Sequence, residues 1–104
     1  FVEIQIKSRV ISGYEEQFAV KEFKPRENFF IVCHNITDNK FYVMPSIIFY
    51  KKGEYKFNRQ RKFRFMRFSQ IEKYENFKNE EGIALLKKAL KNPANILNSI
   101  KNNI

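Results

Sequence analysis

Three polar side chains of types that act on phosphate esters alternate with apolar residues at the start of the chain. The polar residues are Glu3, Gln5 and Lys7, and the residues between and before them are Val2, Ile4 and Ile6. Strict alternation predicts a β-strand with one buried face, here the apolar one. Residues two apart on a strand point the same way, about 6.6 Å apart. We therefore expect a carboxylate, an amide and an ammonium group in a row above a sheet.

Such a row suits the hydrolysis of a phosphodiester. An acidic or amide oxygen can help hold Mg²⁺, which polarises the phosphate and lowers the pKa of a bound water. A lysine can position that water or neutralise the charge that develops on phosphorus. The same three residues could equally form the solvated face of an ordinary strand.

The motif resembles a known nuclease signature. Gln5-Ile6-Lys7, followed by Ser8-Arg9, is similar to the (Asp/Glu/Gln)-x-Lys pattern of the PD-(D/E)xK, or restriction-endonuclease-like, nucleases. It is most similar to small prokaryotic members whose motif strand reads IQVKT/S. The resemblance implies that Gln5 is a metal ligand, that Lys7 is the catalytic lysine and that Glu3 is an auxiliary catalytic carboxylate and ligand, with Mg²⁺ or Mn²⁺ as cofactor.

The features downstream follow an order that is also similar to this family. The apolar run 29–33, the turn cluster 37–40 and the strand 41–44 predict a β-hairpin over residues 29–44. Pro45 stops the second strand, and Ser46 is predicted to cap a short helix over 47–50. Phe41 to Ser46 resembles the family's (F/Y)-Φ-Φ-P-S strand end, and residues 73–86 resemble its "kY(r/e)xaWdLL" close.

We therefore expect an α/β (α+β) fold, with a mixed central sheet, flanking helices and a restriction-endonuclease-like core. The family also has an acidic residue on the strand before the motif strand, and the printed chain begins at the motif strand itself. This departure predicts that an N-terminal part of the core is missing or is supplied by another chain. Residues 1–92 are assigned to the nuclease-like domain and residues 93–104 to a C-terminal helical tail.

Further elements are predicted from local patterns. Residues 16–23 form a short strand or an irregular edge segment, residues 62–68 alternate as a strand, and Ser69 to Glu72 has capping-box form before a helix over 70–77. Asn79 is predicted to cap another helix, ended by Pro93, with one apolar stripe of Ile83, Leu86 and Leu90. Residues 94–104 predict a marginal amphipathic helix.

A basic segment with interleaved aromatic residues follows the short helix. Its only acidic residue is Glu54, and its Tyr and Phe residues could stack on exposed bases while its cations contact phosphates. The alternative is that the aromatic residues belong to the core and the cations to a solvated face. With Arg9 from the first strand, the residues predicted to bind nucleic acid are Arg9, Lys51, Lys52, Lys56, Arg59, Arg61, Lys62, Arg64 and Arg67.

Composition limits the classes of function. The chain has 104 residues, a net charge of +9 and 43% hydrophobic residues, which fits one folded domain with a polyanionic partner. DNA is expected ahead of RNA, with an anionic membrane surface as the rival partner. No segment approaches the length of a transmembrane helix. A single cysteine, Cys33, excludes an internal disulfide and favours a cytoplasmic location. Cys33 and His34 are adjacent on a strand, so they are expected to face opposite ways.

Three functions remain open at this level. The first is metal-dependent cleavage of nucleic acid by a PD-(D/E)xK-like domain. The second is a catalytically inactive module that binds DNA or RNA. The third is a basic interaction subunit whose first strand completes the sheet of a partner chain. A homodimer, or a partner chain that supplies the missing N-terminal elements, is the expected assembly.

Overall fold

Strands and short helices alternate along the chain. The structure, a computed structural model, describes residues 2–13 and 15–91. In chain order the elements are β1 (Glu3–Arg9), β2 (Gln17–Lys21), β3 (Phe29–Asn35), β4 (Lys40–Pro45), α1 (Ser46–Lys52), β5 (Glu54–Asn58), β6 (Arg61–Arg67), α2 (Phe68–Ile71), a 3₁₀ turn η1 (Glu75–Phe77) and α3 (Asn79–Lys91). The predicted α+β class is confirmed. None of the helices in these residues is long and apolar enough to cross a membrane.

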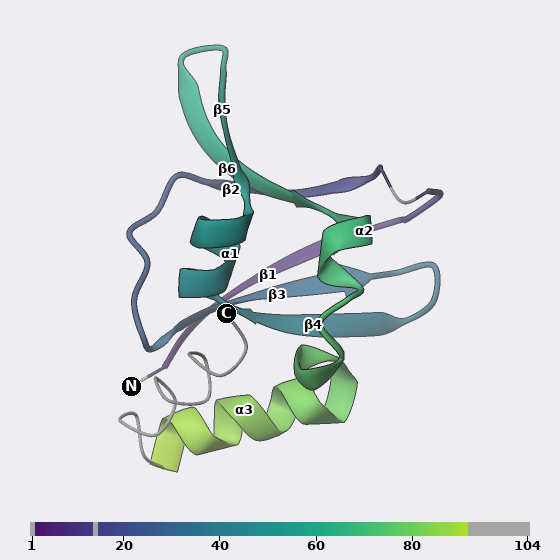
Figure 1. The fold of residues 1–104 in the computed structure, drawn as a ribbon, viewed down its shortest axis with the longest axis vertical. Helices are drawn as coiled ribbons and strands as arrows, with labels where there is room; N and C mark the ends of the chain where they lie inside the picture. Colours follow the sequence, from purple (N-terminus) through teal and green to yellow (C-terminus); the bar gives the residue numbers. More distant parts are fainter. Residues whose placement is uncertain (1, 14, 92–104) are drawn as a thin grey trace.

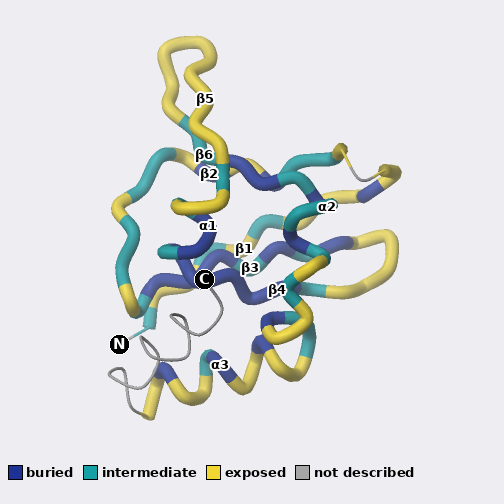
Figure 2. Tube along the Cα trace, viewed as in Figure 1, coloured by how far each residue is buried: buried dark blue, intermediate teal, exposed yellow. Residues whose placement is uncertain are grey.

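The first sheet has the strand order β1-β3-β4, with β1 parallel to β3 and β4 antiparallel to it. β3 is central and almost wholly buried, as its continuous apolar run requires. The predicted hairpin over 29–44 is confirmed, and its first strand continues to Asn35. Figure 2 shows β3 and β4 as the most deeply buried part of the chain.

The second sheet has the order β2-β6-β5 and is antiparallel throughout. The expected short strand at 16–23 is therefore an edge strand, β2, and the alternating segment 62–68 forms most of β6. β5 and β6 make a hairpin whose outer half projects from the body (Figure 1). α1 lies between the sheets, with Ile48 and Phe49 fully buried.

The expectation for the faces of β1 is wrong. Ile4 is 48% exposed and Ile6 is 65% exposed, whereas Gln5 and Lys7 are half-buried. Val43 of β4, Val32 of β3 and Ile6 of β1 are neighbours in one row across this face of the sheet. Val43 lies under α3 and is 1% exposed, Val32 is half-buried, and Ile6 is exposed. α3 therefore covers the β4 end of this face and does not reach β1.

The caps of the short helices also differ from expectation. Pro45 is the N-cap of α1, and the buried Ser46 instead donates to the Arg26 carbonyl oxygen at 2.7 Å and accepts from the Arg26 amide at 3.0 Å. The hydroxyl thus ties down the loop between β2 and β3. The predicted helix over 70–77 is split into α2 and η1. At its start the Arg67 amide donates to Oε1 of Gln70 at 2.9 Å, in place of the predicted capping box over 69–72.

The apolar stripe of α3 is rotated by one residue from the predicted one. The helix buries Gly82, Leu85 and Ala89, while Ile83 is 39% exposed and Leu90 is 67% exposed. Small residues at two of the buried positions let the helix axis approach the sheet closely. Asn79 begins α3, and its Oδ1 accepts from the Phe41 amide at 3.0 Å. The predicted end at Pro93 and the predicted tail lie outside the described residues.

Gly82→Ala is expected to destabilise the fold. A Cβ at this position would lie 2.4 Å from the Phe77 carbonyl oxygen and 2.7 Å from Cγ2 of Val43. Overpacking of this kind costs about 1–3 kcal/mol, although Ala favours a helix over Gly by about 1 kcal/mol. A lower melting temperature by circular dichroism is the expected result. Gly13→Ala is the control, since nothing lies within 4 Å of its added Cβ. Equal melting temperatures for the two variants would contradict the close packing of α3.

Candidate nucleic-acid interface

The three polar residues predicted to share one face of β1 do lie on one face. Glu3, Gln5 and Lys7 stand opposite Phe29, Ile31 and Cys33 of β3, on the face turned toward the interior. The Glu3 carboxylate lies 2.6 Å from the Arg26 guanidinium, in an ion pair that is partly open to solvent. The first of the three predicted catalytic groups therefore already has a cationic partner.

The described residues do not form a metal centre. They contain no cluster of three or more His, Cys, Asp or Glu side chains able to hold a metal ion. Glu3 and Gln5 could supply oxygen ligands, but Mg²⁺ prefers six oxygens in an octahedron, and one oxygen of the Glu3 carboxylate is already held by the Arg26 guanidinium. The residues present thus do not fit the expected Mg²⁺ or Mn²⁺ without further ligands.

Sequence reasoning missed a hydrogen-bonded chain across β1 and β3. Ser8 Oγ lies 3.3 Å from His34 Nδ1, and His34 Nε2 lies 3.2 Å from Asn39 Oδ1, with all three groups near solvent. The chain depends on the parallel register that sets Ser8 opposite His34, and no local pattern announces that register. A serine, a histidine and an amide linked by hydrogen bonds in that order are the groups that a nucleophilic site uses. These three residues line neither the pocket beside Arg9 nor the one beside Tyr42 and Phe68.

Cys33 and His34 face opposite ways, as expected. Cys33 is completely buried, and this burial raises the pKa of its thiol far above the ordinary value. The side chain is thus an inert member of the core.

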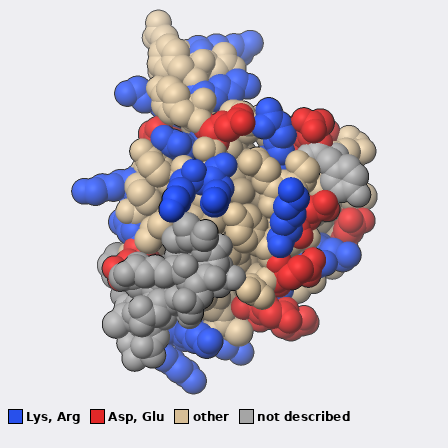
Figure 3. All heavy atoms as spheres, in the orientation of Figure 1, with Lys and Arg blue, Asp and Glu red and all other residues tan. Residues whose placement is uncertain are grey.

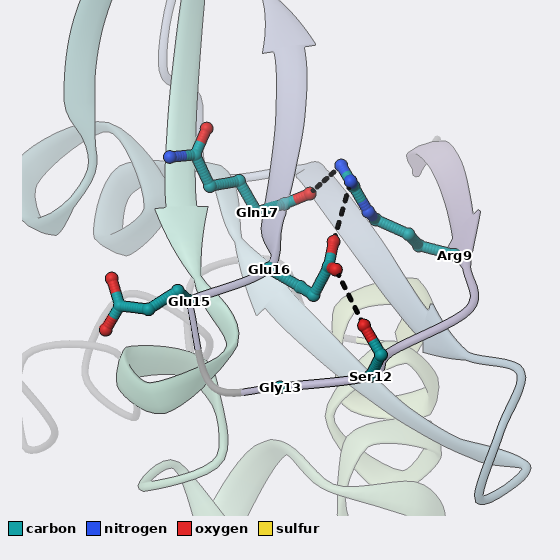
Figure 4. Close-up of a pocket in the computed structure, with 6 residues that line it drawn as sticks. All are labelled: Arg9, Ser12, Gly13, Glu15, Glu16 and Gln17. Carbon is teal, nitrogen blue, oxygen red and sulfur yellow. Dashed lines mark hydrogen bonds and ion pairs between the residues drawn. The ribbon is translucent and has the colours of Figure 1, made fainter.

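Arg9 lies in a small polar pocket between the ends of β1 and β2 (Figure 4). Its guanidinium pairs with the Glu16 carboxylate at 2.7 Å and donates to the Gln17 carbonyl oxygen at 2.8 Å, while Ser12 donates to the same Glu16 carboxylate at 3.0 Å. The pocket has a volume of about 260 Å³. Arg9 therefore closes the β1–β2 loop, and its predicted role in nucleic-acid binding stays a prediction.

The β5–β6 hairpin carries the most distinctive surface of the described chain. All five residues of β5 are exposed, including Tyr55 at 49% and Phe57 at 60%. The register sets Tyr55 opposite Arg64 and Phe57 opposite Lys62, so aromatic rings and cations share one face of the hairpin. Figure 3 shows Lys and Arg side chains on both flanks of this projection.

The tip of the hairpin is a tight two-residue turn. Arg59 has a φ of 50° and Gln60 a φ of 63°, the left-handed pair that a type I′ turn requires. Glycine or asparagine usually occupies such positions, because a Cβ is disfavoured there. A strained turn therefore places the exposed Arg59 at the tip of the hairpin.

The cations predicted to bind nucleic acid fall into two groups. Arg64 is 16% exposed, pairs with Glu22 at 3.1 Å, and lies over the Tyr50 ring at 3.8 Å. Arg67 pairs with both Glu15 and Glu54. With Arg9, which pairs with Glu16, these form the ion-paired group. The other six predicted side chains are exposed and take part in no ion pair found among the described residues: Lys51, Lys52, Lys56, Arg59, Arg61 and Lys62.

Arg64→Ala is expected to lower the free energy of unfolding by about 1–3 kcal/mol, because it removes a mostly buried charge-assisted hydrogen bond and a cation–π contact. Lys62→Ala on the same face should leave stability unchanged. Urea denaturation of both variants is the measurement. Equal midpoints would show that Arg64 is as dispensable to the fold as its exposed neighbour.

Comparison with known proteins adds no family to these observations. No family model matches the chain, and neither a curated protein nor a solved structure matches it. The nuclease resemblance of the β1 motif and of the downstream segments therefore stays a prediction, and the case for function rests on the surface of the molecule itself.

Proposed function

We propose that the protein binds nucleic acid through its β5–β6 hairpin, with unpaired bases against Tyr55 and Phe57 and phosphates against the surrounding cations. The observation that carries the proposal is a projecting hairpin that exposes two aromatic rings, with Lys62, which is in no ion pair found among the described residues, opposite Phe57 and further exposed cations on its other face and at its turn. Phosphate contacts supply affinity and stacking on aromatic rings tolerates any base.

Charge supports this proposal over simple solubility. Between residues 51 and 67 only Glu54 is acidic, and that carboxylate is occupied by Arg67. A solvated face usually mixes both signs, whereas this one concentrates a single sign at a protruding element. The field of such a surface attracts a polyanion and raises its rate of association.

The aromatic side chains favour single-stranded over duplex nucleic acid. Phe57 leaves 60% of its surface in water, although Phe30, Phe49 and Phe77 are almost fully buried. Other phenylalanines of the chain are thus buried in the core, whereas the Phe57 ring is exposed to solvent. A splayed strand offers the exposed base faces that such a ring can stack on, and a duplex does not.

Phe57→Ala should weaken binding of a labelled single-stranded oligonucleotide by roughly 5- to 150-fold, because stacking contributes about 1–3 kcal/mol per base. Fluorescence anisotropy with DNA, RNA and duplex probes measures this loss, and an unchanged melting temperature shows that the fold is intact. Arg61→Ala/Lys62→Ala should also flatten the dependence of the logarithm of affinity on that of salt by about 0.7 per lost contact.

Lys87→Ala/Lys88→Ala is the matched control. It removes the same charge from exposed positions on α3 and leaves the hairpin intact. If the two double variants lose affinity equally, binding follows net charge alone and the hairpin is not the interface.

Metal-dependent phosphodiester hydrolysis is the second candidate, and it rests on the nuclease resemblance. The structure favours it only in that Gln5 and Lys7 share one half-buried face of β1. This candidate requires metal ligands beyond Glu3 and Gln5. It predicts that the chain nicks plasmid or single-stranded DNA with Mg²⁺ or Mn²⁺, and that Lys7→Ala abolishes nicking while leaving anisotropy unchanged. Binding without metal-dependent cleavage by the unsubstituted chain would leave an inactive binding module.

We also propose that the protein is located in the cytoplasm and that it associates with a second chain. The free, buried Cys33 is compatible with a reducing compartment.

A further inference from the structure

β1 is an edge strand of the first sheet, and no strand among the described residues pairs with its outer edge. It ends the strand order β1-β3-β4 and has seven residues without proline. Natural edge strands are usually short, bulged, covered or interrupted by inward-pointing charge. Lys7 supplies one such charge on the inner face of β1, but on the other face two isoleucines stand exposed, Ile4 at 48% and Ile6 at 65%.

The backbone groups along this edge point away from the sheet. The Glu3 amide donates to the Asn28 carbonyl oxygen at 2.8 Å, and the Arg9 carbonyl oxygen accepts from the Ile36 amide at 2.9 Å. Odd-numbered residues of β1 therefore direct their N–H and C=O groups to β3. The same groups of Ile4, Ile6 and Ser8 face outward, in position to accept another strand.

The sequence of the edge is complementary to itself. In an antiparallel pair with a two-fold axis at Gln5, Ile4 stands opposite Ile6 of a second copy, and the two exchange backbone hydrogen bonds. On the other face Glu3 stands opposite Lys7 of the second copy, and Gln5 opposite Gln5. Each contact occurs twice by symmetry, so apolar meets apolar and acid meets base throughout.

We propose that β1 is a homodimerisation strand, which joins two copies of this chain into a continuous six-stranded sheet through the Gln5-centred antiparallel pair. The inference is independent of nucleic-acid binding, because the hairpin belongs to the other sheet. Glu3 faces Arg26 within its own chain, and its second carboxylate oxygen remains for Lys7 of the other copy.

The charge of the chain sets the conditions for the test. Two copies with a net charge of +9 each repel one another at long range, and salt screens this repulsion more than it weakens the contact pair of Glu3 and Lys7. Dimerisation should therefore strengthen as salt rises from 0.05 to about 0.3 M, the opposite of nucleic-acid binding.

A charge-reversal set tests both the dimer and its register by analytical ultracentrifugation. Glu3→Lys and Lys7→Glu should each weaken dimerisation at least about tenfold, because each sets like charges opposite one another twice. The double variant Glu3→Lys/Lys7→Glu should recover part of the lost affinity but not all of it, because the lysine that it places at position 3 also lies beside Arg26 of its own chain. In a pair centred on Ile6 instead, residue 3 would face Arg9 and the double variant would not recover.

Ile6→Pro adds a backbone test, since it removes an outward N–H and no hydrogen bond to β3. The variant should be folded by circular dichroism and monomeric by analytical ultracentrifugation. A wild-type chain that is monomeric at every concentration and salt tested would overturn the proposal, and so would a dimer unaffected by the charge reversals or one that the double variant fails to restore in part.

Discussion

The arrangement depends on the pairing of β3 with strands on both sides, since β3 is the buried centre of the first sheet. Its partner β4 arrives through a tight turn, but β1 is parallel to it and requires a crossover. Residues 10–28 make that crossover, and on the way they contribute β2 to the second sheet. The buried hydroxyl of Ser46 holds both backbone groups of Arg26 at the return of the crossover. One side chain thus couples the start of α1, the end of the crossover and, through the Arg26 guanidinium, Glu3 on β1.

Elements whose contacts are local could be predicted from the sequence. The 29–44 hairpin, the helix after Pro45 and the helix from Asn79 follow from an apolar run, a turn cluster and the change to helical spacing. The faces could not be predicted in the same way. Alternation shows which residues of β1 share a face, but the covered face depends on how far α3 extends across the sheet. The stripe on α3 depends likewise on Gly82, because closeness to Val43 selects that side of the helix.

The candidate site also combines a part that the sequence predicts with a part that it does not. Composition locates the basic segment, but only the folded structure shows which of its cations are ion-paired and which are exposed without an acidic partner. Arg64 and Arg67 pair with carboxylates just after β2, in the loop before β2 and on β5. These are distant in sequence, so no local pattern separates the two arginines from Arg61 and Lys62. The partner of Glu3 on β1 could not be predicted from its neighbours in the sequence either. Gln5 and Lys7 suggest a catalytic row, whereas the Glu3 carboxylate pairs with Arg26 in the crossover.

The two proposed surfaces are linked through net charge even though they lie on different sheets. A nucleic acid on the hairpin cancels part of the +9 charge that keeps two copies apart. Binding should then favour pairing of β1, and pairing should favour binding by the same factor, because coupling between two equilibria is reciprocal. Two hairpins in one dimer would also hold one strand at two points and raise the effective concentration of the second contact. The advantage of long strands over short ones should then be larger while the β1 edge is intact than after it is broken.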